Sequence, residues 1–528
     1  MANGEIIILP FHDSGHVFPA TELASRLAAR NYCVTLLLPS APSTNSFRLS
    51  PLIQIVEHPR VHPPSAPPAS SSPPSAPPAS SSPPPAPPFQ EDLSLFRDLL
   101  HERMGGEDRS ARPVCAIVDV MMGQALDVCR EFGLPAAIFF TSSACSAAMD
   151  YAAAKIRSGE SDALRGLPEE MALPTVDLMR AGPPPLRPSG DLAPPPPPFE
   201  HRHHGGGPIP PPLVPGGDLA PPPLPFEHRH QGGGPIPPGP PPALAQMDGA
   251  IALLFNTCDD LEHPFLEYLA SKAKKPIWGI GPLLPSQFWS AAGSVLRDGA
   301  IRSTTGKGNP GAISESDVIE FLDSKPHGSV LYVSFGSIVI PSDEELQELT
   351  EALKESSRPF IWALQRHTRR PGAPKVYFPE GLAEEAKGRG MVIHGWAPQL
   401  LILSHPAVGG FVTHCGWNST VEALGLGVPV LAWPVHGDQV WNAKLVVRRL
   451  RTGLAVKGES GGMVMRKEVA EGIERLMRDE ETRKRAATVA SEVFTGGAIK
   501  SSEAALGTFL EFMDSKRKVS EAKETRGL

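Results

Sequence analysis

The chain has 528 residues, of which 62 are proline, 41% are apolar and 20% are charged, and its formal net charge is −8. This apolar content is enough for large cores, which excludes a fibrous protein, a wholly disordered protein and a small disulfide-stapled scaffold. The acidic balance argues against a nucleic-acid-binding protein, which would present a basic surface.

More than half of the prolines fall in two segments, 62–88 and 183–243, and both segments contain internal repeats. The first repeats PPSAPPASSS, and the second repeats a stretch that begins GDLAPPP and ends GGGPIPP. Such composition is typical of extended, solvated chain without a core. The second segment also carries five clustered histidines that could bind a metal, although surface histidines copied with the repeat are the simpler interpretation. These histidines are His201, His203, His204, His228 and His230.

The six cysteines are scattered without a CxxC pair, which favours reduced thiols over a disulfide framework or a zinc site. The first residues, MANGEIIILPFHDSGH, lack the basic region and the long apolar run of a signal peptide. No stretch of about 18 apolar residues occurs, so no membrane span is expected. We therefore expect a cytoplasmic protein, and a monomer.

Short apolar runs alternate with helical patterns in the first half, which is typical of a parallel sheet covered on both faces. The first unit is a strand over 5–9, a helix over 19–30 that begins at Pro19, and a strand over 33–38. The pattern continues with strands over 114–118, 136–140, 251–255 and 276–279 and helices over 122–132, 144–155 and 260–272.

The second half repeats this theme, with a helix over 343–354 opened by Ser342. Its strands are expected over 329–335, 359–364, 391–394, 409–413 and 428–432. The sequence thus predicts an α/β protein with two doubly wound, Rossmann-like domains that face each other. The expected parts are a first domain over 1–281, a linker over 282–315, a second domain over 316–495, a helix over 496–513 that packs back on the first domain, and a polar tail over 514–528.

The strongest motif is the 44-residue segment from Trp396 to Gln439, WAPQLLILSHPAVGGFVTHCGWNSTVEALGLGVPVLAWPVHGDQ. It contains a strand, a glycine-bearing turn and a helix opened by Asn418 and Ser419. The start of a helix presents unpaired N–H groups and a positive dipole end, which suit a diphosphate. Trp396 offers a face on which a base can stack, and Glu422 can accept hydrogen bonds from ribose hydroxyls. The segment therefore has the parts that a nucleotide diphosphate sugar requires.

This segment resembles the plant secondary-product signature of the UDP-dependent family 1 glycosyltransferases, with every main position filled. The similarity extends to PFHDSGHVFP, NTCDDLE, GIGPLLP and GSVLYVSFGS elsewhere in the chain. The resemblance implies the GT-B fold, an active site between the two domains, a UDP-sugar donor and no metal or other cofactor. It assigns the base to Trp396, Ala397 and Gln399, the ribose to Glu422, the diphosphate to Ser14, Ser337, His414, Asn418 and Ser419, and the sugar hydroxyls to Thr141, Trp417, Asp438 and Gln439. In this family a glutamine at the last position of the segment goes with UDP-glucose.

The candidate catalytic residues are His16 and Asp119. His16 ends the loop after the first strand and Asp119 follows the strand over 114–118, so both belong to the carboxyl edge of the predicted sheet, where ligands bind. A histidine near its reference pKa is a suitable general base, and a carboxylate on its other nitrogen would fix its tautomer. The pair resembles the catalytic dyad of the family. This implies inverting transfer of glucose to a small phenolic or flavonoid acceptor, giving a β-O-glucoside.

Three other functions compete with this one. A non-catalytic protein that binds UDP-sugars or phenolics remains open, because the repeat segment 183–243 lies where acceptor-side loops are expected. A UDP-sugar epimerase shares the two-domain fold but needs further acid and base groups in the sugar site. A nicotinamide-dependent enzyme is disfavoured because no GxGxxG motif follows the first strand.

Overall fold

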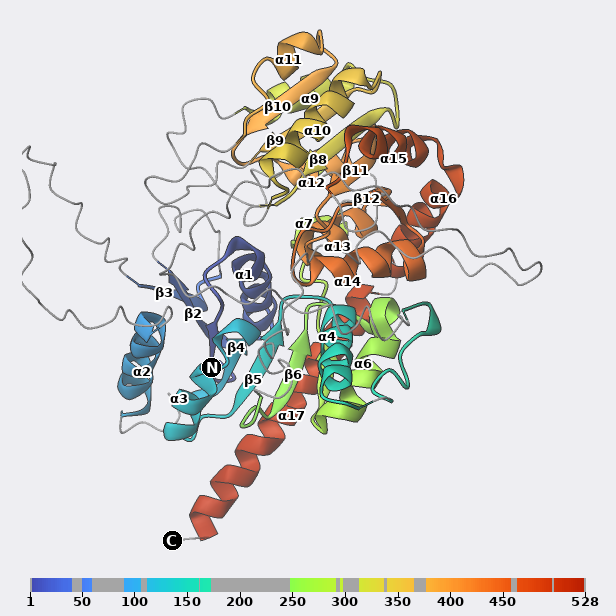
Figure 1. Cartoon of the computed structure of the whole chain (residues 1–528). Coiled ribbons are helices and arrows are strands. Elements are labelled where there is room, and N and C mark those ends of the chain that lie inside the picture. Colours follow the sequence, from blue (N-terminus) through green and yellow to red (C-terminus); the bar gives the residue numbers. More distant parts are fainter. Residues whose placement is uncertain are drawn as a thin grey trace, which may run out of the picture.

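The computed structural model describes residues 2–39, 50–58, 90–105, 112–160, 162–171, 247–290, 295–297, 313–336, 340–364, 377–456, 463–495 and 498–526. Both proline-rich segments, the five clustered histidines, Ser337 and most of the expected linker lie outside these residues. The described residues form two α/β domains, drawn one above the other in Figure 1.

The N-terminal domain contains a seven-stranded parallel sheet in the order β3-β2-β1-β4-β5-β6-β7. Its strands are β1 (Glu5–Leu9), β2 (Cys33–Pro39), β3 (Ile53–His58), β4 (Pro113–Asp119), β5 (Ala136–Phe140), β6 (Ala252–Phe255) and β7 (Ile277–Gly279). The central strands are apolar throughout because helices cover both faces of the sheet. These helices are α1 (Ser14–Ala28), α2 (Gln90–Met104), α3 (Ala125–Glu131), α4 (Ala144–Arg157) and α6 (Asp259–Ala273), and the short α7 (Ser286–Ser290) follows the last strand.

The C-terminal domain contains a six-stranded parallel sheet in the order β10-β9-β8-β11-β12-β13. Its strands are β8 (Val330–Ser334), β9 (Phe360–Leu364), β10 (Gly390–His394), β11 (Val408–Thr413), β12 (Val430–Ala432) and β13 (Gly453–Ala455). Its helices are α9 (Glu315–Asp323), α10 (Asp343–Glu355), α11 (Leu382–Glu385), α12 (Gln399–Ser404), α13 (Trp417–Gly425), α14 (Gln439–Lys444), α15 (Arg466–Arg478) and α16 (Glu480–Val489), with π-helical turns at Leu445–Leu450 and Ala490–Phe494. The two parallel sheets confirm the predicted fold class.

The last helix, α17 (Ala498–Arg526), returns to the N-terminal domain, as Figure 1 shows in red. Leu506 and Phe509 are fully buried, and the Phe509 ring lies 5.6 Å from Trp278 of β7 between ring centroids. The helix was expected to end near residue 513, but it continues to Arg526 through the segment expected to be a polar tail.

The helices near the N-terminal site begin and end differently from the sequence expectation. Helix α1 begins at Ser14 instead of Pro19, so Pro19 lies inside it. The helix expected over 122–132 is divided, because Asp119 accepts a hydrogen bond from the Met121 N–H and caps a separate 3₁₀ turn ahead of α3. Strands β3 and β13 and helix α2 were not expected. The first two lie at the edges of their sheets, and β13 has only three residues, which leave a weak pattern.

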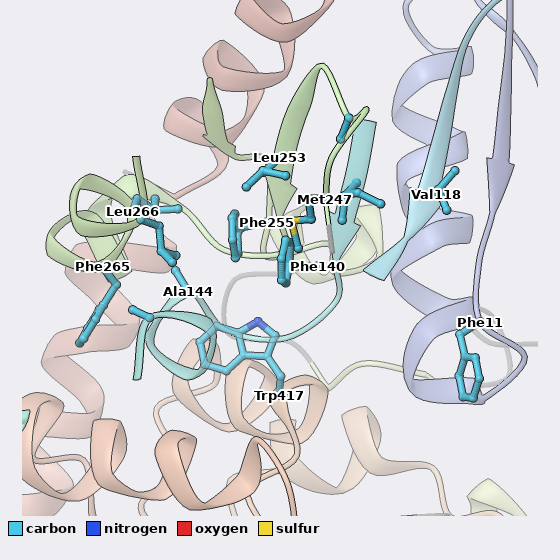
Figure 2. Close-up of a cluster of buried hydrophobic side chains, with 14 of the residues drawn as sticks. Phe11, Val118, Phe140, Ala144, Met247, Leu253, Phe255, Phe265, Leu266 and Trp417 are labelled. Atoms are coloured by element: carbon cyan, nitrogen blue, oxygen red, sulfur yellow. The ribbon is translucent and has the colours of Figure 1, made fainter. Parts of the chain in front are cut away.

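The two domains share one apolar cluster. Trp417 at the start of α13 packs in the same cluster as Phe140 and Phe255 of the N-terminal sheet. Figure 2 shows its indole reaching from the C-terminal domain toward these two rings. All six cysteines are free. No helix among the described residues is both long enough and apolar enough to cross a membrane.

Candidate active site

The two candidate catalytic residues, His16 and Asp119, are in direct contact. Nδ1 of His16 lies 2.8 Å from Oδ2 of Asp119. The contact arises because β1 and β4 are neighbouring parallel strands, so the residues after them meet at one sheet edge. The other carboxylate oxygen, Oδ1, accepts a hydrogen bond of 2.8 Å from the backbone N–H of Met121, and Asp119 is 1% exposed. The backbone therefore fixes Asp119 independently of its contact with the imidazole.

Burial lowers the pKa of His16. The hydrogen bond and the charge of Asp119, together with the charges of Asp13 and Asp438, outweigh burial and raise the pKa above its usual value. An ionised Asp119 is only an acceptor, so the neutral imidazole carries its proton on Nδ1. The lone pair is then on Nε2, which is the atom available to remove a proton from a hydroxyl group.

Thr141, the residue after β5, also contacts this imidazole. Its Oγ1 lies 2.9 Å from Nδ1 of His16, and its backbone carbonyl accepts a hydrogen bond of 3.5 Å from Nδ2 of Asn256. The resemblance assigned Thr141 to a sugar hydroxyl. In the structure its hydroxyl contacts the candidate base, and the sugar contact stays a prediction.

Helix α1 positions His16 in its first turn, with Asp13 as the N-cap residue. Pro19 has no N–H, so it cannot donate to the carbonyl of Gly15 four residues earlier, as a helical residue normally does. That carbonyl accepts a hydrogen bond of 3.0 Å from Nδ2 of Asn418, in the first turn of α13. The proline thus leaves an acceptor next to His16 for a donor from the other domain.

The turn between β11 and α13 holds His414 in a confined place. Cys415 has a φ of 63°, in the left-handed region that residues other than glycine rarely adopt. A Cβ atom at Gly336 or Gly416 would come within 2.7 Å or 2.5 Å of the His414 ring, so both glycines allow its close approach. Burial lowers the pKa of His414 to about 4, so the ring is neutral at cellular pH. A neutral imidazole still offers one N–H to an anion.

The residues assigned to the base and the ribose lie beside the start of α13. Trp396 is 37% exposed, and its ring lies 5.9 Å from that of Phe18 in α1 between centroids. Nε2 of Gln399 donates to Oγ of Ser419 at 3.1 Å and to Oε2 of Glu422 at 2.8 Å. Glu422 is 1% exposed, so Gln399 holds a buried carboxylate against the helix.

The residues assigned to the sugar, Asp438 and Gln439, lie at the start of α14. Oε1 of Gln439 accepts hydrogen bonds of 2.9 Å from the backbone N–H groups of Val435 and His436, which leaves its NH₂ group as the donor. Burial raises the pKa of Asp438, and a hydrogen bond from Asn442 opposes that rise. Oδ2 of Asp438 accepts this bond at 2.9 Å.

The remaining predicted residues fall in different places. Ser14 is the first residue of α1, and Ala397 is buried before α12. Ser337 is not among the described residues. Trp417 is 3% exposed and its indole N–H donates to the carbonyl of Asn256 at 2.7 Å, so its contact with the sugar stays a prediction.

Two buried asparagines at the domain junction were missed. The side chain of Asn256 donates to the carbonyl of Thr141 and accepts from the N–H of Leu283, while its backbone carbonyl accepts from the indole of Trp417. Asn442 bonds to Ser143 of the N-terminal domain and to two groups of the C-terminal domain. Asn442 lies three residues beyond the 44-residue segment. An amide on a short, otherwise largely apolar helix was the available signal.

Comparison with known proteins finds similarity to one family of transferases. Residues 307–505 match the model of the UDP-glucoronosyl and UDP-glucosyl transferase family. UDP-glycosyltransferase 73B4 of Arabidopsis thaliana is 35% identical over 242 residues, which are 45% of this chain and 48% of that protein. Residues 307–505 are thus similar to the UDP-glycosyltransferase family, and the curated relatives of this chain are plant UDP-glycosyltransferases. It spans about half the length of the curated relatives it matches.

Solved structures extend the similarity of fold to nearly the whole chain. A UDP-glucosyltransferase from Polygonum tinctorium has a TM-score of 0.62 at 24% identity, covering 97% of this chain and 98% of that chain. The structure of LpCGTa in complex with UDP has a TM-score of 0.63 at 26% identity, covering 97% and 99%. These likenesses and the two parallel sheets confirm the expected GT-B fold.

Proposed function

We propose that this protein transfers glucose from UDP-glucose to a hydroxyl group of a small specialised metabolite, a phenol or flavonoid, with inversion and without a metal. The observation that carries the proposal is the His16–Asp119 pair, held at 2.8 Å beside the first turn of α13. The pair can deprotonate an acceptor, and that turn has the N–H groups and the neutral His414 that suit a leaving diphosphate.

The reaction would be a single displacement at the anomeric carbon. Nε2 of His16 takes the proton of the acceptor hydroxyl as its oxygen forms the new bond, and the bond from the anomeric carbon to the UDP oxygen breaks. Asp119 stabilises the imidazolium that results. The helix start and the His414 N–H meet the growing charge on UDP. Asp438 and Gln439 would orient the sugar through its hydroxyl groups.

The test is product analysis by mass spectrometry with the purified full chain, UDP-glucose and a mixed panel of phenols, flavonols, acids and terpenoid alcohols. We expect an acceptor to gain one hexose, and we expect His16→Ala to abolish that product. His263→Ala is the matched control, because His263 also lies 2.8 Å from an aspartate, Asp259, but on the surface of α6. Its activity should equal that of the parent protein.

The outcomes separate the alternatives. Product that persists in His16→Ala would refute the assigned base. Absence of product with UDP-glucose, UDP-galactose and UDP-glucuronate, while UDP-glucose still binds, would favour a non-catalytic binding protein. In that case deletion of 190–243 is the next experiment, because this segment lies on the expected acceptor side.

A further inference from the structure

One buried amide connects the parts of the site that the proposed function assigns to the diphosphate and to the sugar. Asn442 in α14 is 0% exposed. Its Nδ2 donates to the backbone carbonyl of Cys415 at 3.0 Å and to Oδ2 of Asp438 at 2.9 Å. Its Oδ1 accepts a hydrogen bond of 2.6 Å from Oγ of Ser143. Both amide hydrogens and the amide oxygen are therefore in use.

The bond to Cys415 stabilises an unfavourable backbone conformation. Cys415 has a φ of 63°, and a left-handed conformation costs a residue with a Cβ atom on the order of 1 kcal/mol or more. This conformation carries the chain from His414 into the first turn of α13, beginning at Trp417. A donor on the Cys415 carbonyl fixes the peptide plane that sets the direction of that turn.

The bond to Asp438 fixes the sugar end of the site in a similar way. Asp438 precedes α14, and Asn442 lies one helical turn later, so the amide reaches back to the carboxylate. Because this hydrogen bond holds Oδ2 of Asp438, the orientation of the carboxylate is fixed, and so is the direction in which Oδ1 points. The same nitrogen of Asn442 donates to both Cys415 and Asp438. If the diphosphate-binding turn or the sugar-binding carboxylate shifts alone, one of these two hydrogen bonds lengthens.

Ser143 supplies the donor for the amide oxygen of Asn442 from the other domain. It is the N-cap residue of α4 in the N-terminal domain, where its oxygen accepts from the N–H of Ser146 while its hydroxyl donates to Asn442. A flipped amide would place an NH₂ group against that donor and an oxygen against two acceptors. The two acceptors, Cys415 and Asp438, therefore set the orientation, and the docking of the two domains satisfies the remaining amide oxygen.

We propose that Asn442 is a positioning residue that keeps the sugar-binding carboxylate and the diphosphate-binding turn in register. The inference rests on the proposed function, and it can be tested by binding, without an acceptor. Asn442→Leu keeps the branched shape of the side chain and removes both donors. We expect the affinity for UDP-glucose to fall about 10- to 100-fold and that for UDP to fall less, because UDP lacks the group that Asp438 holds.

The pH dependence of binding distinguishes positioning from a loss of stability. Asn442 stabilises the ionised form of Asp438, and the other titratable groups near that carboxylate are His16 of α1, Asp150 of α4 and the Cys415 thiol. Without Asn442 the pKa of Asp438 rises further, so the loss of UDP-glucose binding on acidification begins at a higher pH. The pH profile for UDP should not move in this way.

Val469→Ala is the matched control, because Val469 is fully buried in α15 among residues of another apolar cluster. It lowers stability through a cavity and should leave both affinities unchanged. If Asn442→Leu does not fold, Asn442→Asp is measured instead, since it keeps the shape and faces two acceptors with an oxygen. Equal losses for UDP and UDP-glucose, or an unmoved pH profile, would overturn the inference alone. A parent protein that binds no UDP-glucose would overturn the proposed function and this inference with it.

Discussion

Replacement of Asp119 by asparagine tests the catalytic pair most directly. The carboxylate has two acceptors in use, one for the N–H of Met121 and one for Nδ1–H of His16. An asparagine has only one oxygen. If this oxygen keeps the backbone bond, the NH₂ group faces the imidazole and donates to Nδ1. The proton then moves to Nε2, and the lone pair is lost from the atom that must act as the base.

The size of the expected change in the pKa of His16 follows from its hydrogen bond to Asp119. A hydrogen bond of 2.8 Å to a buried carboxylate contributes about 1.5–3 kcal/mol, which corresponds to a pKa change of about one to two units. The pKa of His16, now raised, should fall by about that amount. The wrong tautomer of His16 and the lost charge of Asp119 together should lower kcat about 10²- to 10⁴-fold, which is within the range of general-base catalysis.

The assay is kcat and kcat/KM against pH, with UDP-glucose and an acceptor found in the product analysis. The base is inactive when protonated, so in the parent protein the rate falls as pH drops through the raised pKa of His16. In Asp119→Asn this acidic limb should move to lower pH while the whole profile falls. A decrease of less than tenfold, or an acidic limb that stays in place, would refute the reasoning.

Three further outcomes are expected. Trp396→Ala should weaken UDP binding about 10- to 100-fold in calorimetry, because a stacked base contributes about 1–3 kcal/mol, and an unchanged affinity would exclude stacking. His414→Ala should also weaken UDP binding. Because burial lowers the pKa of His414 to about 4, UDP binding to the parent protein should show no transition near pH 6.5 that depends on His414. A transition near pH 6.5 that disappears in the variant would contradict this. Phe509→Ala should lower the free energy of unfolding by about 3–5 kcal/mol in denaturant titration, and a loss below about 1 kcal/mol would show that α17 contributes little.

The central strands and the approach of His16 to Asp119 followed from the sequence because both depend on the chain order of parallel strands. Buried strands read as apolar runs, and the residues after them meet at one edge. No such rule determines contacts between domains. The donation from Asn418 to Gly15 requires the final orientation of two sheets, and nothing local predicts it.

The hydrogen-bond partners of side chains were harder to predict than the positions of the residues. Thr141 and Trp417 occupy the expected region, but each is bonded to a neighbour that the motif does not contain, His16 and Asn256. Pro19 was interpreted as a helix start because proline suits the first turn. The helix instead begins five residues earlier, where Asp13 provides the N-cap, and the missing N–H is compensated from the other domain.

The position of α17 has a consequence for synthesis on the ribosome. Leu506 and Phe509 complete the core beneath one face of the N-terminal sheet, although in the chain they follow the whole C-terminal domain. Domains generally fold as units in the order in which they emerge. Here the first domain to emerge keeps an apolar face uncovered until the second has been made. The N-terminal domain is therefore completed only after the C-terminal domain has been made. A stop codon ahead of residue 498 would leave one face of the N-terminal sheet uncovered.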